Sequence, residues 1–171
     1  MPQLFLPRGG SATTWDTFFA AEVGASAALA GLIFVGLSIN LQRILSLPTV
    51  ANRAAQSIML LVGVLGVASV LLIPAQTGAA QAVEVLAVAL PLWAGLDLIE
   101  LRNWARIPTT FHRALGYHTI ELQVPCALFV GGAVFVGLGN AGGLFWFPAA
   151  MIVCFLVAVL EAWVLLVEIN R

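Results

Sequence analysis

Charge is the scarcest property of this sequence. Only 9% of the residues are charged, and lysine does not occur at all, so all seven basic side chains are arginines. A soluble domain carries about 25% charged residues, and this shortfall is too large for a soluble protein with one buried helix. The chain also lacks a strong basic field, which argues against nucleic acid as a partner.

Cysteine is equally sparse, and the first residues do not predict a cleavable signal peptide. The two cysteines, Cys126 and Cys154, both lie inside apolar runs. That position argues against a secreted disulfide framework and favours small packing residues. Residues 1–14 contain two prolines but not the charged start and apolar core of a cleavable signal peptide. We therefore expect an irregular N-terminal arm over 1–14, followed by an uncleaved first helix.

Apolar residues dominate what remains: the chain is 61% hydrophobic, with a mean hydropathy of +1.05. Several apolar runs are long enough for a helix that crosses a hydrocarbon core of ~30 Å. They predict an all-α, polytopic transmembrane helix bundle that forms a single domain over residues 1–171. Its five crossings are expected at about 18–41, 54–73, 81–101, 118–138 and 145–168. Pro91 predicts a kink in the third crossing, and Pro48 predicts a loop before the second.

The placement of the arginines predicts the orientation of the bundle. If the N-terminus lies outside and the C-terminus inside, only Arg8 is outside the cell. The cytoplasmic segments then hold the other six, Arg43, Arg53, Arg102, Arg106, Arg113 and Arg171. This asymmetry is the positive-inside pattern of membrane proteins. Arg102 and Arg106, with Trp104 between them, are in addition candidate contacts for anionic lipid headgroups.

The first crossing has two unusual faces when it is placed on a helix at ~100° per residue. One face is a seam of small residues, Ala20, Gly24, Ala27, Gly31 and Ser38. The opposite face is a polar line with an apolar residue in its middle, Glu22, Ser26, Ile33 and Asn40. The seam predicts close packing within the subunit, which leaves the polar line for a symmetry axis or a partner.

The polar line has two interpretations. If it lines a pore, Glu22 forms an outer acidic ring that favours cations, and Ile33 forms a hydrophobic constriction that gates by dewetting. In the simpler alternative, Glu22 complements the dipole of its helix, and Asn40 is a residue at the inner membrane boundary.

Glu161 is the acid that lies deepest in a predicted crossing, about two turns, or ~10 Å, from the helix end. A charge at that depth costs ~2.5 kcal/mol or more unless it is paired, hydrated or protonated. Three interpretations remain open. Glu161 forms an ion pair with an inner arginine such as Arg43 or Arg102, it handles protons or ions, or it is neutral and hydrogen-bonded toward Gln123 or Asn40. The other acids lie near helix ends, where water and headgroups satisfy them.

Two further patterns carry little weight. His118 and Glu121 are three residues apart, a spacing that metal sites use, but a histidine at a membrane boundary is normally solvated, so no metal is predicted. Residues 137–142 match the dinucleotide fingerprint G-x-G-x-x-G, but they lack the preceding strand, and a hairpin turn explains their glycines better. No nucleophile has a base and an orienting partner. The sequence therefore predicts neither an enzyme nor a cofactor.

The segments GASAALAGLIFVGLSINLQRIL (Gly24–Leu45) and AWVLLVEINR (Ala162–Arg171) resemble a family of small bacterial multi-pass membrane proteins without an assigned activity. The resemblance spans the whole chain and implies a location in the bacterial inner (plasma) membrane. It transfers no functional residue.

Two hypotheses for function follow. In the first, the chain is a non-enzymatic membrane protein that acts through helix packing, as a homo-oligomer or as an accessory subunit of a membrane assembly. The short loops and small-residue faces motivate this hypothesis. In the second, oligomers form a cation channel or small-ion conduit lined by the first helix.

Overall fold

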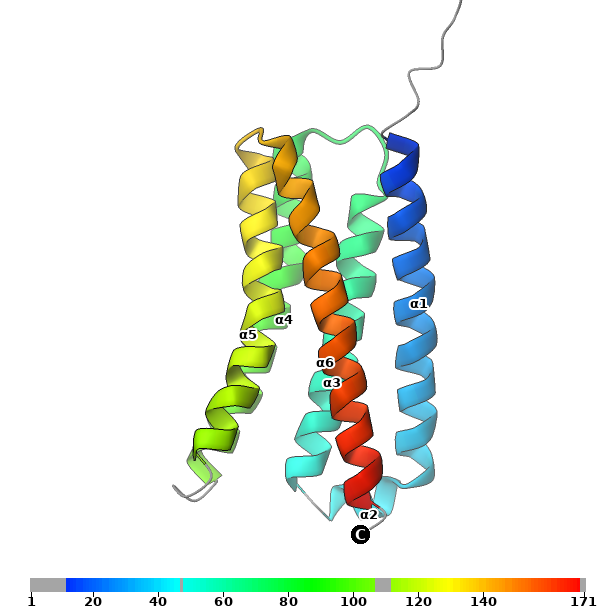
Figure 1. Cartoon of the computed structure of the whole chain (residues 1–171), viewed down its shortest axis with the longest axis vertical. Helices are drawn as coiled ribbons and strands as arrows, with labels where there is room; N and C mark the ends of the chain where they lie inside the picture. The colour runs from blue at the N-terminus through cyan, green and yellow to red at the C-terminus, as the bar shows by residue number, and fades with distance from the viewer. Residues whose placement is uncertain (1–11, 47, 107–111, 170–171) are drawn as a thin grey trace, which may run out of the picture.

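The computed structural model describes residues 12–46, 48–106 and 112–169, and its long elements there are all α-helices (Figure 1). Their order is α1 (Ala12–Ile39), α2 (Leu41–Leu45), α3 (Pro48–Leu71), α4 (Gly78–Arg106), α5 (His112–Gly137), the 3-10 helix η2 (Ala141–Phe145) and α6 (Trp146–Ile169). No strand occurs in these described ranges. The predicted arm over 1–14 lies almost wholly outside them.

Within the described residues, five helices are long and apolar enough to cross a membrane, which confirms the predicted class and number of crossings. The candidate spans are Trp15–Ile39, Val50–Leu71, Gly78–Ala105, Gly116–Gly137 and Gly142–Leu165. The protein is therefore a multi-pass membrane bundle. The N-out, C-in orientation stays a prediction, because helix length and apolarity do not distinguish the two sides of a bilayer.

The connection between the first two crossings differs from the prediction. The short helix α2 follows α1, and α3 begins at Pro48 rather than near residue 54. Proline has no backbone N–H, but the first helical residue needs none, so Pro48 starts the helix instead of preventing it. As a result, Asn52 and Arg53 lie on the first turns of α3 rather than in a loop.

The central helix of the bundle is α3, which packs against α1, α4 and α6. The α4–α5 pair covers one side of the bundle, and α5 also packs against α6 (Figure 1). By contrast, α1 is peripheral. Only 11% of its most apolar window is buried, compared with 56% for α3. Most of the surface of α1 therefore faces lipid or another protein.

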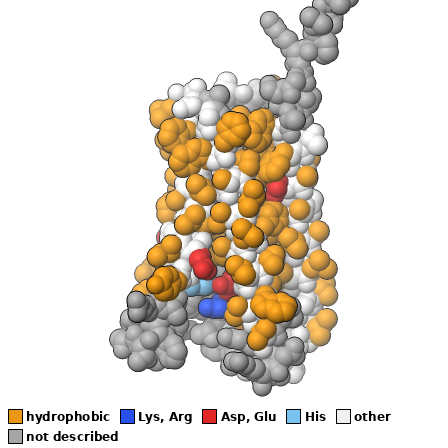
Figure 2. Space-filling model, in the orientation of Figure 1, with side chains coloured by type: hydrophobic (Ala, Val, Ile, Leu, Met, Phe, Trp, Pro, Cys, Tyr) orange, Lys and Arg blue, Asp and Glu red, His pale blue; other side chains and the backbone are white. Residues whose placement is uncertain are grey.

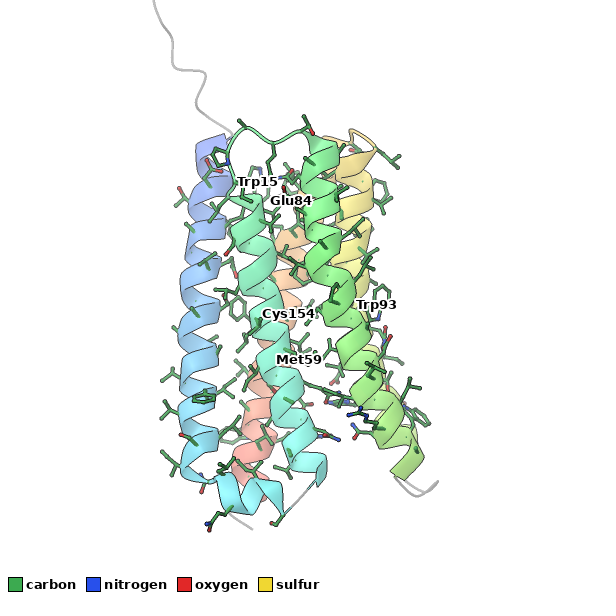
Figure 3. The ribbon with its side chains drawn as sticks, turned by 180° about the vertical axis from the view of Figure 1, so that it is seen from behind. Trp15, Met59, Glu84, Trp93 and Cys154 are labelled. Carbon is green, nitrogen blue, oxygen red and sulfur yellow. The ribbon has the colours of Figure 1, made fainter. Side chains whose placement is uncertain are left out.

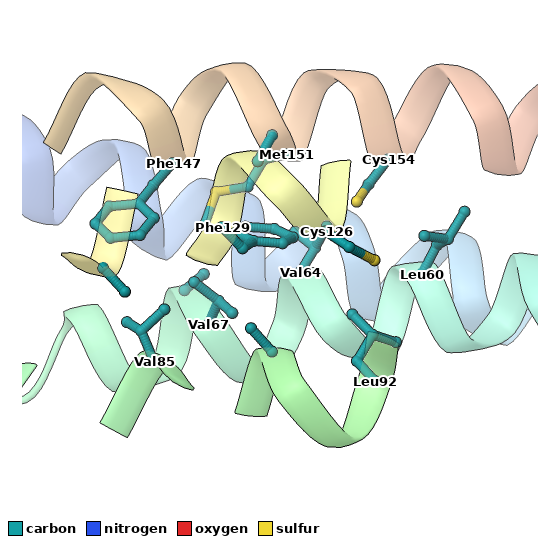
Figure 4. Packing of buried hydrophobic residues seen from close by; sticks show 14 of the residues in the cluster. Leu60, Val64, Val67, Val85, Leu92, Cys126, Phe129, Phe147, Met151 and Cys154 are labelled. Atoms are coloured by element: carbon teal, nitrogen blue, oxygen red, sulfur yellow. The ribbon is translucent and has the colours of Figure 1, made fainter. Parts of the chain in front are cut away.

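The main apolar cluster fills the space between α3, α4, α5 and α6 (Figure 4). Its largest fully buried side chains include Leu60, Phe129, Phe147 and Met151. Cys126 and Cys154 are free thiols in the same cluster, 1% and 0% exposed, which confirms their interpretation as small packing residues. A second apolar cluster joins α2, α3 and α6 and consists of Ile44, Val50, Ala54 and Leu165.

Two prolines lie inside neighbouring helices, Pro91 in α4 and Pro125 in α5. A proline removes the bond to the carbonyl four residues earlier and crowds that carbonyl, so helices bend there. Both helices lean away from α3 and α6 toward the α4–α5 connection (Figure 1). Seen from behind, α4 turns outward beyond the labelled Trp93 (Figure 3), as the predicted kink at Pro91 requires.

The α5–α6 connection is a tight turn, as expected. Gly139 has φ +81°, a left-handed conformation that favours glycine. The Asn140 side chain accepts a hydrogen bond of 2.9 Å from the backbone N–H of Gly142. A Cβ at Gly143 would lie 2.7 Å from the backbone nitrogen of Val136. The glycines of the fingerprint-like segment thus serve a turn and close backbone packing.

Candidate functional site

Buried polar side chains gather at the end of the bundle where α3 and α5 begin and α4 and α6 end. We call this set the polar cluster and define it as Asn52, Arg53, Gln56, Glu100, Asn103, His118, Thr119 and Glu161. Figure 2 shows acidic, histidine and basic side chains together toward the lower end of one face of the molecule. Four helices contribute to the cluster, so its contacts bear on how those helices are held together.

His118 lies at the centre of the polar cluster, with only 6% of its side chain exposed. Its Nδ1 is 3.2 Å from Oε1 of Glu100 on α4, and its Nε2 is 3.1 Å from Oε1 of Glu161 on α6. Neither contact has the alignment of a hydrogen bond, so both are ion pairs. Because a carboxylate oxygen would repel a bare ring nitrogen, this geometry favours the imidazolium form of His118.

Glu100 is surrounded by hydrogen-bond donors. Its Oε1 accepts bonds from Nε2 of Gln56 at 2.7 Å and from Nδ2 of Asn103 at 3.3 Å. Its Oε2 accepts a bond of 2.9 Å from the hydroxyl of Thr119. A carboxylate only accepts, whereas a protonated carboxyl must also donate. With donors at both oxygens, Glu100 is held as a carboxylate.

Glu161 has far fewer partners. Its Oε2 lies 3.6 Å from Nε of Arg53, beyond hydrogen-bond distance, and this buried oxygen has no hydrogen-bond partner. The side chain of Arg53 is 35% exposed, whereas that of Glu161 is 7% exposed. Arg53 therefore connects the buried acid to the aqueous end of the bundle. With Glu100 and His118 the charges balance, since two carboxylates face one guanidinium and one imidazolium.

The ion pair expected for Glu161 is present, and the structure describes partners that the sequence did not suggest. They are Arg53 and His118, because α3 starts early enough to carry Arg53 into the bundle. Arg102 is exposed, and the side chain of Arg43 lies outside the described residues.

The two amides proposed for a neutral Glu161 are engaged elsewhere. Gln123 donates to Oδ1 of Asp97 at 2.5 Å and accepts from the indole of Trp93. Asn40 donates to the carbonyl of Gly36 on its own helix at 3.5 Å. Glu161 is therefore not hydrogen-bonded to Gln123 or Asn40, as its predicted neutral form would require.

Two residues of the polar cluster were wrongly interpreted from the sequence. His118 was expected to be solvated and Glu100 to lie near water, but they are only 6% and 3% exposed. A signal was present: Asn52 and Gln56 are four residues apart, and Glu100 and Asn103 are three apart, so each pair shares a helix face. Polar faces on neighbouring apolar helices are expected to meet each other.

The spacing that suggested a metal site does not form one. Glu121 is exposed, whereas His118 is buried. The two nitrogens of His118 face carboxylates on opposite sides of the ring, so these groups cannot converge on one ion. Among the described residues, no group of three His, Cys, Asp or Glu side chains is arranged to hold a metal.

The two faces of α1 have exchanged the roles that the sequence predicted. In the polar line, Ser26 is buried, and Glu22, Ile33 and Asn40 are half-buried against the rest of the subunit. The seam residues Ala20, Gly24, Ala27, Gly31 and Ser38 are all exposed. A Cβ at Gly24 or Gly31 would meet nothing within 4 Å. The prediction that the seam packs inside the subunit is wrong.

The apolar residues of α1 that lie beside the polar line are half-buried against the rest of the subunit. Leu29 and Ile33 border an apolar groove of about 240 Å³ that α1 shares with α3 and α6, where it meets Leu61 and Ala158. Ser26 is satisfied locally, by the carbonyl of Val23 at 3.1 Å.

The predicted headgroup contacts lie at the end of α4. Arg102 is exposed, and the indole of Trp104 is 37% exposed and donates to Oγ1 of Thr119 at 3.3 Å. The side chain of Arg106 lies outside the described residues. Trp104 thus sits between the polar cluster and the surface.

Comparison of the chain with protein-family models, curated proteins and solved structures finds no match.

Proposed function

We propose that this multi-pass membrane protein is a non-enzymatic, proton-responsive bundle in which the polar cluster takes up and releases a proton. One observation carries the proposal: the buried imidazole of His118 lies between two carboxylates that come from two other helices. Ionisable groups inside a membrane are costly, and by default they point to a functional site. A structural ion pair alone gains little, because desolvation offsets much of the attraction.

The core favours a proton switch over a proton conductor. Beyond the polar cluster, the bundle interior is the main apolar cluster, with Leu60, Phe129 and Met151 among its largest side chains. Among the described residues, no acid, base or histidine is buried in that cluster. A proton therefore has a route to Glu161 from the Arg53 end, and the described residues offer no further buried carboxylate or histidine to carry it to the opposite end.

Infrared difference spectroscopy on the protein in lipid vesicles tests this proposal. We expect an acid-minus-neutral spectrum with the C=O band of a protonated, poorly hydrated carboxyl. The band should disappear in Glu161→Gln. The band should persist in Glu121→Gln, the matched control, because Glu121 is an exposed acid on α5, one turn after His118. A wild-type spectrum without the band, or a band that survives in Glu161→Gln, overturns the assignment.

A packing role is the second candidate, in which the chain is a homo-oligomer or an accessory subunit of a membrane assembly. The exposed seam on α1 supports it, since small residues let another helix approach closely in a membrane. Native mass spectrometry from detergent tests the packing role. A strict monomer with no co-purified partner would contradict it. A pore lined by the first helix would need the polar line to face a symmetry axis. The polar line instead lies against its own subunit, which does not favour the pore hypothesis.

Location and lipid contacts complete the proposal. The resemblance to small bacterial membrane proteins supports the bacterial inner membrane, with the arginine-rich segments on the cytoplasmic side. In that orientation the polar cluster faces the cytoplasm. Arg102, Trp104 and Arg106 would then lie at the level of anionic headgroups.

A further inference from the structure

We infer that the α4–α5 hairpin is clasped to α3 and α6 at the polar cluster, and that protonation of Glu161 releases this clasp and opens the end of the bundle. The inference rests on the proposed function, because it needs a proton to reach Glu161. It adds the movement that the proton controls.

Apolar packing does not hold the hairpin at this end. The last residue that α4 contributes to an apolar cluster is Leu96, and the first from α5 is Leu122. Between these two positions, no described side chain belongs to either apolar cluster. The second apolar cluster lies at the same end but joins only α2, α3 and α6, with half-buried residues of α1 and α3 against it. Interactions other than apolar packing therefore hold the hairpin at this end.

Polar contacts join the hairpin to α3 and α6 instead. They are Asn52 Nδ2 to Asn103 Oδ1 at 2.5 Å, Gln56 Nε2 to Glu100 Oε1 at 2.7 Å, and His118 Nε2 to Glu161 Oε1 at 3.1 Å. Of these three contacts, the one between His118 and Glu161 is the contact to α6, and it is the one between opposite charges. Its strength therefore depends on the charge of Glu161.

Glu161 is the member of the cluster best suited to take the proton. Its Oε2 is buried without a hydrogen-bond partner, whereas both oxygens of Glu100 accept bonds. Around it, α3 supplies Arg53 and α5 supplies His118, while the acids of α1 lie toward the other end of that helix. A proton from hydronium forms an O–H bond on the carboxylate and leaves a water molecule. Arg53 and Nε2 of His118 then lose the negative charge opposite them, while Nδ1 of His118 still faces Glu100.

The prolines provide points about which the hairpin can swing. Pro91 precedes Glu100 by nine residues and Pro125 follows His118 by seven, so each lies within the stretch of its helix that contributes to the main apolar cluster, about two to three turns from the clasp. Each removes one backbone hydrogen bond from its helix. The outward lean of both helices in Figure 1 continues in the direction that opening requires.

Distance measurements between spin labels test the inference. Ile120 on α5 and Trp163 on α6 lie two residues from His118 and Glu161 and are 60% and 65% exposed, so cysteines at these positions accept labels. The native Cys126 and Cys154 are buried and should stay unlabelled. We expect the distance to widen by several ångströms as the pH falls, and to be wide at every pH in Glu161→Gln.

Two controls make the result specific. A label pair at Val134 and Ile152, in the other half of the same two helices, should keep its distance at all pH values. Glu121→Gln should titrate like the wild type. If the infrared carboxyl band titrates while the first distance stays constant, the clasp is wrong and the proposed function stands. If neither the band nor the distance responds, both fail. The wild-type titration decides this even if Glu161→Gln does not fold.

Discussion

The two ends of this bundle are held together by different interactions. At the α5–α6 turn, glycines on α5 admit aromatic rings of α6 at close range: a Cβ at Gly132 would lie 2.9 Å from a ring carbon of Phe147. At the other end, the hairpin meets α3 and α6 through amides, carboxylates and one imidazole. Apolar packing responds little to pH, whereas ion pairs do, so we expect the polar cluster to respond to pH more strongly than the packing at the α5–α6 turn.

A similar contrast separates the two acids of the polar cluster. Glu100 accepts bonds from three side chains, Gln56, Asn103 and Thr119, and its charge is well compensated. Glu161 relies on two cations, at 3.1 and 3.6 Å, and keeps one buried oxygen without a hydrogen bond. The two acids are therefore similarly buried but differently coordinated, and this difference is the reason why the proposal assigns the proton to Glu161.

The largest expected effect comes from removing the central cation. His118→Asn leaves Glu100 and Glu161 facing each other with Arg53 as the one cation at ion-pair distance among the described residues. We expect it to lower the free energy of unfolding by about 3–5 kcal/mol near neutral pH. The deficit should shrink in acid, where protonation removes a negative charge. Denaturant unfolding in detergent at two pH values measures this, and an equal deficit at both contradicts the charge assignment.

Glu161→Gln should follow, with a loss of about 3 kcal/mol, because it removes the negative charge that faces Arg53 and Nε2 of the buried His118. The change keeps shape and hydrogen bonding, so the loss reports the charge. Thermal unfolding of this variant beside Glu121→Gln gives the measurement. An almost silent Glu161→Gln would mean that Glu161 is neutral in the folded protein and would reject the ion pair.

Phe147→Ala tests the apolar end. Phe147 is fully buried, and its truncation should cost about 2–4 kcal/mol through a cavity and lost dispersion contacts. Because no charge is involved, we expect the same loss at neutral and acidic pH. The unfolding experiments used for His118→Asn provide the comparison. A strongly pH-dependent loss would show that the two ends are not energetically distinct.

The smallest effect on stability is expected on the exposed face of α1. Gly31→Leu meets no atom within 4 Å of its Cβ and should change the free energy of unfolding by less than about 0.5 kcal/mol. If the seam is an interface between subunits, the same variant should shift the protein toward monomer in native mass spectrometry. A destabilised monomer would place the seam inside the subunit after all.

The number of crossings and the α5–α6 turn could be predicted because they depend on local properties. Bilayer thickness sets the length of an apolar helix, and the glycines around Asn140 leave few alternatives to a turn. The partners of Glu161 could not be predicted, because they depend on where α3 begins. That start, at Pro48, placed Arg53 on a helix where the sequence suggested a loop.

The sequence by itself determined that this is a bundle of five apolar helices with an acid deep enough to need a partner, water or a proton. Only the tertiary structure decided which side chains meet at that acid and which face of α1 turns inward. The physical reason is that a membrane helix is apolar on nearly all sides, so its hydrophobic pattern marks no inner face. Its orientation is set by packing against neighbours, and that packing brought His118 between Glu100 and Glu161.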